Sequence, residues 1–150
     1  MTTEERPAFL APSTGERLFN RMLGTLVGLG LAPGHMFLLE VRGRKSGQIY
    51  RTPVDLLEVE GKQYLVAPRG RTQWVRNAEA AGEIVLKRGT QRRHYRLRAV
   101  AGQDRLPYLK AYLDRFKTEV QRFFPLPAGS PPQAFAAVAE NYPVFELLPA

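Results

Sequence analysis

Several short β-like runs, separated by tight turns, constrain the fold of this chain more than any other feature. They lie at residues 36–41, 51–59, 63–67, 84–86, 91–100 and 144–148. The connections at 43–47, 60–61 and 88–89 each contain glycine and are too short for the crossover that parallel neighbours require. Consecutive strands therefore pair antiparallel. We expect an α+β protein built as a small Greek-key or split β-barrel, with about six antiparallel strands and flanking helices.

Helical apolar spacing marks the segments that flank the predicted barrel, which are 17–31, 73–81, 106–124 and 133–141. Before them, residues 1–13 hold two prolines and are expected to form a loose arm. Segment 17–31 either packs on the core or lies on a membrane surface near a lipid-soluble substrate. With 150 residues, the chain has the size of one domain, which we expect to span 1–150.

Cysteine content and charge limit the function. The sequence has no cysteine, which excludes disulfides, thiolate zinc sites and thiol nucleophiles. Its formal net charge of +8 favours anionic partners, such as nucleic acid, anionic lipid or a phosphorylated small molecule. The first ten residues carry no apolar run of a secretory signal. We expect a cytoplasmic protein, peripheral at the inner face of the cell membrane if segment 17–31 lies on it.

The strongest local signal is a basic turn between two predicted strands, Gly43-Arg44-Lys45-Ser46-Gly47. Its glycines permit positive φ and exposed backbone N–H groups, while its other side chains add two positive charges and a hydroxyl. Arg51 follows closely enough to converge on the same point. Such a cluster suits a phosphate or a carboxylate. The alternative is an ordinary solvated hairpin turn, and a P-loop is excluded because no helix follows directly.

The second signal is the only tryptophan, Trp74, which follows a loop rich in arginine. Arg69, Arg71 and Arg76 surround it in the sequence, and Asn77 lies one helical turn beyond it. A large ring beside helix N-terminal N–H groups suits a heterocycle or an anion. The alternative is a core tryptophan that anchors a short helix, with exposed arginines around it.

Candidates for acid–base or metal chemistry are sparse. His35 and His94 each stand alone, with no His, Asp or Glu at metal-ligand spacing, so no metal site is expected. Tyr108 and Tyr112 are four residues apart and share a helix face. They belong to the core, or line a pocket if one opens beside that helix, and they are the only candidate catalytic residues.

The strand at 91–100 carries arginines that raise the alternative of nucleic-acid binding, namely Arg92, Arg93, Arg96 and Arg98. Base stacking would need an aromatic ring on the same face. Tyr95 falls on the opposite face from Arg96 and Arg98, because successive strand residues alternate in direction. We therefore expect no nucleic-acid partner.

The order of these motifs resembles the deazaflavin (F420)-dependent nitroreductase family, whose members are also described as F420H2-dependent quinone reductases. The resemblance rests on the basic turn, then Arg51 and Pro53, then the Trp74-to-Asn77 helix start, and it is clearest over residues 34–86. It implies a split β-barrel of the flavin-reductase and PNP-oxidase kind. It also implies coenzyme F420, a hydride carrier with a phosphate and an oligoglutamate tail.

Carried over by residue, the resemblance implies two groups of contacts. The phosphate and tail would be held by Arg44, Lys45, Ser46, Gly47 and Arg51. The deazaflavin ring would be bordered by Pro53, Ala67, Pro68, Arg69, Trp74 and Asn77. FMN is the alternative cofactor, because it also presents a phosphate and a tricyclic ring.

The implied activity is hydride transfer from a reduced deazaflavin to a quinone, a nitroaromatic or an activated alkene. The alternative is a non-catalytic split-barrel module that binds a flavin, a fatty acid or another anionic ligand. Pro68 favours that alternative, because the family often has Ser followed by Lys where Pro68 and Arg69 stand, so the hydroxyl near the reactive edge of the ring is missing. The expected assembly is a monomer or a homodimer.

Overall fold

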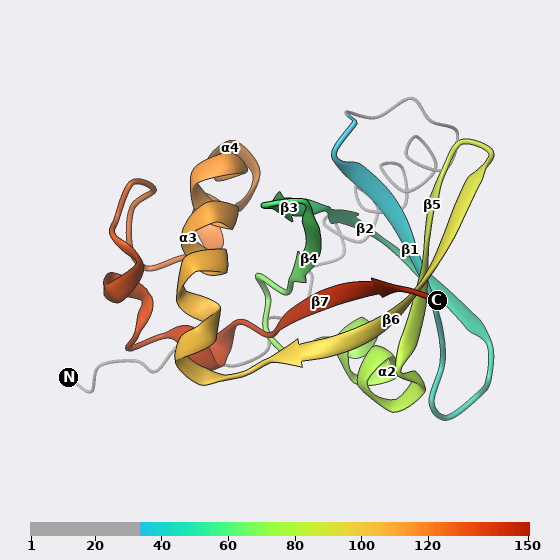
Figure 1. The fold of residues 1–150 in the computed structure, drawn as a ribbon. Coiled ribbons are helices and arrows are strands. Elements are labelled where there is room, and N and C mark those ends of the chain that lie inside the picture. The colour runs from blue at the N-terminus through green and yellow to red at the C-terminus, as the bar shows by residue number, and fades with distance from the viewer. Residues whose placement is uncertain (1–33) are drawn as a thin grey trace.

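The structure, a computed structural model, describes residues 34–150, so the predicted arm at 1–13 and the predicted helix at 17–31 lie outside the described residues. One antiparallel sheet of seven strands dominates the described part, in the order β2-β1-β5-β6-β7-β4-β3 (Figure 1). The strands are β1 (Met36–Arg42), β2 (Ile49–Asp55), β3 (Leu57–Val59), β4 (Lys62–Val66), β5 (Glu83–Arg88), β6 (Gln91–Val100) and β7 (Val144–Pro149).

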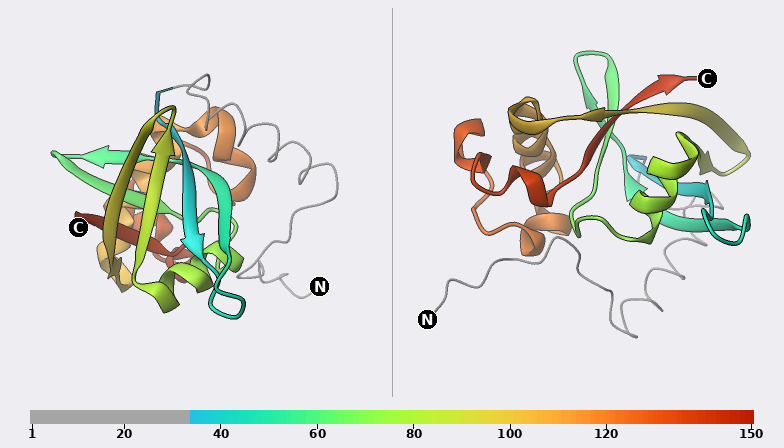
Figure 2. Two further views of the ribbon diagram at one scale, coloured as in Figure 1. Left: turned by 90° about the vertical axis from the view of Figure 1, so that its right-hand side faces the viewer. Right: turned by 90° about the horizontal axis from the view of Figure 1, so that it is seen from below.

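The two edge strands of this sheet follow each other in the chain. β2 forms one edge and β3 the other, and only Leu56 separates them. A chain can pass from one edge to the other in a single residue only if the sheet curls round on itself. The views in Figure 2 show this curl, in which the long strand β6 is one of the strands. The expected split barrel is confirmed.

The passage at Leu56 also corrects the predicted strand count. Residues 51–59 were expected to form one strand, but the structure divides them into β2 and β3, giving seven strands instead of about six. The Leu56 N–H donates to the carbonyl of His35 at 2.8 Å, just before β1, and the Leu56 side chain is buried. The division therefore lies where the chain leaves one edge of the sheet for the other.

The predicted helix 73–81 is confirmed as α2 (Gln73–Ala81), which ends at Gly82 with φ of 75°. The predicted helix 106–124 is broken into α3 (Leu106–Arg115), α4 (Lys117–Val120) and a 3₁₀ turn at Gln121–Phe123. The break falls at Phe116, where ψ is 27° and the ring packs on Tyr112. None of the helices in residues 34–150 is long and apolar enough to span a bilayer.

The predicted helix 133–141 is also wrong. Two separate 3₁₀ turns, Pro132–Phe135 and Ala139–Asn141, replace it, and a further 3₁₀ turn at Gly102–Arg105 leads into α3. The backbone at Val138 has ψ of 0°, which interrupts the helical path, while Phe135 and Ala139 are buried on either side. Burial of these two side chains thus prevails over regular helical geometry.

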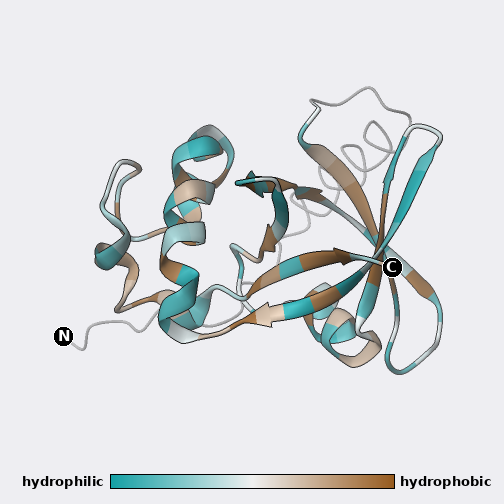
Figure 3. Ribbon diagram, in the orientation of Figure 1, coloured by the Kyte–Doolittle hydropathy of each residue, from teal (hydrophilic) through white to brown (hydrophobic). Residues whose placement is uncertain are grey.

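Two apolar clusters hold the described part together. One fills the curl of the sheet and includes Leu39, Leu65 and Leu86, and the other packs α3 against the sheet through Leu109 and Leu113. Figure 3 shows β1 as largely hydrophobic, whereas the β5–β6 hairpin is hydrophilic toward its tip.

The alternation predicted for residues 91–100 is confirmed in β6. Tyr95 is buried in the cluster that fills the curl, while His94, Arg96 and Arg98 are exposed. Arg98 forms an ion pair with Glu146 of β7 at 2.6 Å. Because the Tyr95 ring packs inside, it cannot serve as a stacking surface among these arginines.

Truncating Leu109 tests the packing of α3 on the sheet. The side chain is fully buried, so Leu109→Ala leaves a cavity and is expected to lower the free energy of unfolding by about 2–5 kcal/mol. Lys117→Ala, at an exposed position of α4, serves as the control and is expected to change it by less than about 0.5 kcal/mol. Urea denaturation measures both, and equal values for the two variants would contradict the described packing.

Candidate functional site

A cavity of about 1030 Å³ runs along β2, between the basic turn and the start of α2 on one side and α3–α4 on the other. Every residue predicted to bind a cofactor lines it except Gly47. The lining residues from that prediction are Arg44, Lys45, Ser46, Arg51, Pro53, Ala67, Pro68, Arg69, Trp74 and Asn77. Segments that are far apart in the sequence thus meet around one space.

The basic turn at residues 43–47 joins β1 to β2 and has a defined shape. The Gly43 N–H donates to the Gln48 carbonyl at 2.7 Å, and the Gly47 N–H donates to the Gly43 carbonyl at 2.9 Å. Gly47 has φ of 75°, which favours glycine. At Gly43, a Cβ would lie 2.5 Å from the ring of Tyr50. The turn thus favours glycine at 47 through its backbone, and at 43 a larger residue would have to displace the exposed Tyr50 ring.

Asn77 ties this turn to α2. Its side-chain oxygen accepts a hydrogen bond from the Arg44 N–H at 3.1 Å and another from Arg44 Nη1 at 2.7 Å. Arg44 Nη1 also donates to Gln73 Oε1 at 3.0 Å. Asn77 is only 4% exposed, so its carboxamide is a fixed part of the interior. Asn77 was expected to border a ring, and in the structure its oxygen positions Arg44.

The other polar residues of the turn, Lys45 and Ser46, are both exposed. Ser46 Oγ accepts a hydrogen bond from the Gln48 N–H at 3.2 Å and lies 3.3 Å from the hydroxyl of Tyr50. The Ser46 hydroxyl thus helps to fix the turn, and Lys45 adds an exposed cation to it.

Arg51 is held by a buried carboxylate. Its Nε donates to Glu40 Oε2 at 2.6 Å, and Arg92 pairs with the other oxygen of Glu40 at 2.5 Å. Burial raises the pKa of Glu40, but the hydrogen bonds from Arg51 and Arg92 outweigh it and leave this pKa below its usual range. Glu40 is therefore ionised and directs Arg51 toward the cavity wall.

An apolar wall adjoins the basic turn. Trp74 is partly buried, packs against Phe145 with ring centroids 6.2 Å apart, and also lines the cavity. Ala67 and Val75 are buried beneath it. Trp74 therefore anchors α2 in the core and also presents part of its ring to the cavity, while its contact with a heterocycle stays a prediction.

A second pair of cations lines the cavity near α4. The guanidinium groups of Arg69 and Arg122 lie 4.6 Å and 4.4 Å from the ring centroid of Phe123. Cations over a ring face are attracted to its electrons. The cavity therefore contains two cationic regions, one at the basic turn and one at this arginine–phenylalanine stack.

The two candidate catalytic tyrosines have different places. Tyr108 does not line the cavity, and its ring stacks on Tyr64 at 4.1 Å, with the Tyr64 hydroxyl donating to the Tyr108 hydroxyl at 3.1 Å. Tyr112 does line the cavity but is only 2% exposed. Burial raises the pKa of Tyr112 well above its usual range, and the carboxylates of Asp55 and Glu119 raise it further.

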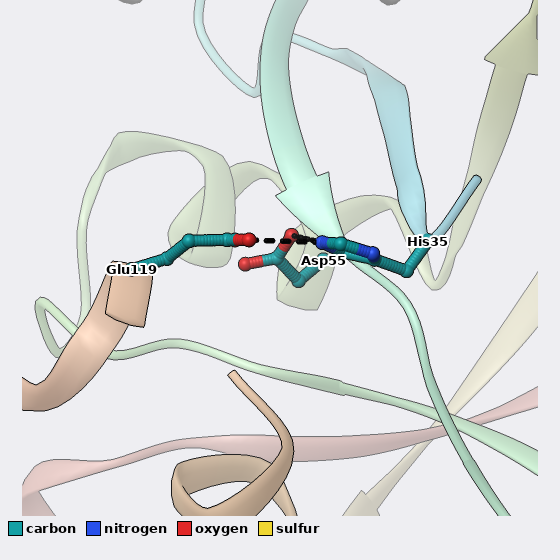
Figure 4. Close-up of side chains that lie close together, drawn as sticks. All are labelled: His35, Asp55 and Glu119. Carbon is teal, nitrogen blue, oxygen red and sulfur yellow. Dashed lines mark hydrogen bonds and ion pairs between the residues drawn. The ribbon is translucent and has the colours of Figure 1, made fainter. Parts of the chain in front are cut away.

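Sequence reasoning missed a cluster at the end of β2 (Figure 4). His35 Nε2 lies 3.0 Å from Glu119 Oε1 and 3.3 Å from Asp55 Oδ1. The expectation that His35 stands alone is therefore wrong, because the fold brings together residues that are distant in sequence. Burial raises the pKa of Asp55, and the neighbouring Glu119 raises it further, to about 8.

A sequence model of the F420H(2)-dependent quinone reductase family matches residues 15–121. The chain belongs to this family. Its members are oxidoreductases by name, and the name implies use of coenzyme F420. No curated protein matches the chain.

Solved structures support the fold of this F420H2-dependent quinone reductase family member. An F420-H2 dependent reductase, FDR-A, superposes with a TM-score of 0.52 at 20% identity, covering 76% of this chain and 94% of that one. A protein described as a domain-swapped dimer has a TM-score of 0.54 at 21% identity, covering 89% of this chain and 92% of that one. The haem storage protein HutZ of Vibrio cholerae has a TM-score of 0.54 at 10% identity, covering 79% of this chain and 83% of that one. At such identities these likenesses show the split barrel alone.

Asn77→Ala tests the link between the basic turn and α2. It removes the acceptor of two Arg44 hydrogen bonds at a buried position, so we expect the free energy of unfolding to fall by about 1–3 kcal/mol. Gln73→Ala removes the exposed acceptor of the same arginine and is expected to cost less than about 0.5 kcal/mol. Urea denaturation compares them, and a smaller loss for Asn77→Ala than for Gln73→Ala would contradict the link.

The Asp55 carboxyl predicts an unusual pH dependence of stability. Its pKa is raised from an ordinary 3.8 to about 8, so the folded state holds this proton more tightly than the unfolded state does. The stability that this proton adds is fully present below the ordinary pKa and is lost as pH rises through the folded pKa. The free energy of unfolding then falls by at most about 1.4 kcal/mol per pH unit. Denaturation between pH 4 and 9 should therefore show a decline that Asp55→Asn removes. An identical decline in the variant would contradict this assignment.

Proposed function

We propose that this protein is an F420H2-dependent oxidoreductase that passes hydride from a reduced deazaflavin to a small organic acceptor. The acceptor classes are quinones, nitroaromatics and activated alkenes. One observation carries the proposal: a single cavity has a basic turn at one end and an apolar aromatic wall beside it. A phosphorylated tail needs the first, and a planar redox ring needs the second.

The residues present fit such a cofactor. Arg44 and Lys45 supply positive charge for a phosphate and an oligoglutamate tail, and Asn77 holds Arg44 in place. Pro53, Ala67 and Trp74 supply a wall with few polar groups for the ring. The volume of about 1030 Å³ is at the upper end of ligand sites, as a long cofactor plus an acceptor requires. When bound, the reduced deazaflavin supplies a hydride. The chain supplies orientation and exclusion of water.

A second candidate is a non-catalytic module on the same barrel, which binds FMN, a fatty acid or another anionic ligand. Pro68 favours it, because a residue without a side-chain hydroxyl or a backbone N–H lines the cavity next to Ala67. HutZ, which has a similar fold, is described as a haem storage protein. Mass spectrometry of the ligand retained by the purified protein distinguishes the two, since a fatty acid with no turnover favours the module.

Assembly and location remain predictions of the same proposal. A homodimer is the assembly that we propose, and the similar structure described as a domain-swapped dimer supports it. A cytoplasmic location, peripheral at the membrane through segment 17–31, would suit a lipid-soluble quinone. Light scattering tests the first, and sedimentation with lipid vesicles tests the second.

Lys45→Ala tests the cationic end of the cavity. Lys45 is exposed and lines the cavity, so its loss should leave the fold intact and weaken F420 binding about tenfold, which is about 1.4 kcal/mol. The control is Lys117→Ala, an equal loss of charge outside the cavity lining. Fluorescence titration with F420 at low and high salt gives the affinities. Equal affinities for the two variants, or no F420 binding by the wild-type protein, would contradict the proposal.

A further inference from the structure

The cavity follows β2 from its basic end to its acidic end. Arg51, Pro53 and Asp55 all line it, and Arg51 lies nearest the basic turn. At about 3.3 Å per residue, Asp55 lies about 13 Å farther along the strand than Arg51. A ligand anchored at the basic turn, with its ring near Pro53, therefore extends toward Asp55. The space beside Asp55 is where an acceptor would lie against the reactive part of such a ring.

The cluster around Asp55 joins this space to solvent. The Asp55 side chain is only 9% exposed, whereas the side chains of His35 and Glu119 are 33% and 38% exposed. His35 Nε2 makes a hydrogen bond with Glu119 Oε1 at 3.0 Å and lies 3.3 Å from Asp55 Oδ1, and polar atoms of the three side chains all lie within 4.8 Å of one another (Figure 4). A proton lost from the buried carboxyl can be replaced through these groups from water.

We propose that Asp55 is the catalytic acid that protonates the hydride acceptor in this cavity, and that Glu119 and His35 are positioning residues that keep it supplied with a proton. The inference rests on the proposed function, and it names the group that completes the reduction. No other acidic side chain among residues 34–150 both lines the cavity and is this deeply buried.

The step balances as follows. The acceptor takes up one hydride, with two electrons, from the reduced deazaflavin, which is thereby oxidised. Negative charge then develops on the acceptor oxygen. The O–H bond to that oxygen forms as the O–H bond of Asp55 breaks, leaving the Asp55 carboxylate. Water returns the proton through either His35 or Glu119, both of which are partly exposed to solvent.

The surroundings favour a protonated Asp55 before each turnover. Two carboxyl groups this close are not both ionised at low cost, and the buried member keeps the proton more readily than the exposed one. Glu119 of α4, His35 before β1 and Tyr112 of α3 face Asp55. Burial and the Glu119 charge both raise the pKa of Asp55.

Three variants test the assignment. Asp55→Asn should lower kcat with F420H2 and a quinone by about 100-fold, as expected for loss of a general acid, with F420 affinity within twofold of wild type. Glu119→Gln removes the charge that raises the pKa of Asp55, so kcat should be retained at low pH and should fall at a lower pH than in wild type. Glu58→Gln, on the exposed part of β3, is the control and should match wild type.

A spectroscopic readout does not depend on turnover. Infrared titration of the protein without ligand should show a protonated carboxyl that ionises near pH 8 in wild type and is missing in Asp55→Asn.

Unchanged kcat in an Asp55→Asn protein that binds F420 would overturn this inference alone. The inference would also be overturned if a chelator abolished the activity and zinc restored it. The Asp55 carboxylate would then be a metal ligand and could not carry the proton. Failure of the wild-type protein to bind F420 would overturn the proposed function as well, and the infrared result would still report the carboxyl.

Discussion

The hydrogen bonds between Arg44 and Asn77 hold the candidate site together. One buried carboxamide oxygen accepts from both the backbone and the guanidinium of Arg44, and so fixes the basic turn between β1 and β2 against α2. A flexible turn would spread its charges into water, where each has little effect on a ligand. Fixed in this way, the turn presents its charge beside the ring of Trp74, three residues before Asn77 on the same helix.

The curl of the sheet produces the rest of the site. Because β2 and β3 are opposite edges joined by one residue, the end of β2 must turn inward, toward α3 and α4. Asp55 is the last residue of β2 and is thereby buried beside Glu119 and His35. The same strand thus has a cationic environment near its start and a shared-proton environment at its end. In the proposed function, the first would hold the charged cofactor and the second would protonate the acceptor.

Local patterns in the sequence predicted the antiparallel barrel, α2 and the basic turn, because strands, turns and short amphipathic helices depend on neighbouring residues. The sequence did not predict the division at Leu56 or the break at Phe116, since both residues are buried against the distant segment at His35. It also missed the cluster, because His35, Asp55 and Glu119 carry no common motif and meet only through the curl. Tyr108 was a candidate on helical spacing alone, and its pairing with Tyr64 places it outside the cavity.

The cavity has cationic side chains in two places, so a bound cofactor has two possible directions in it. Anions can pair with Arg44 and Lys45 at the basic turn or with Arg69 and Arg122 beside Phe123. A crystal structure of the protein with oxidised F420 measures this directly. We expect the phosphate at hydrogen-bonding distance, roughly 3 Å, from Arg44 and Lys45, with the ring between Pro53 and Asp55. A phosphate bound instead at Arg69 and Arg122 would contradict this arrangement.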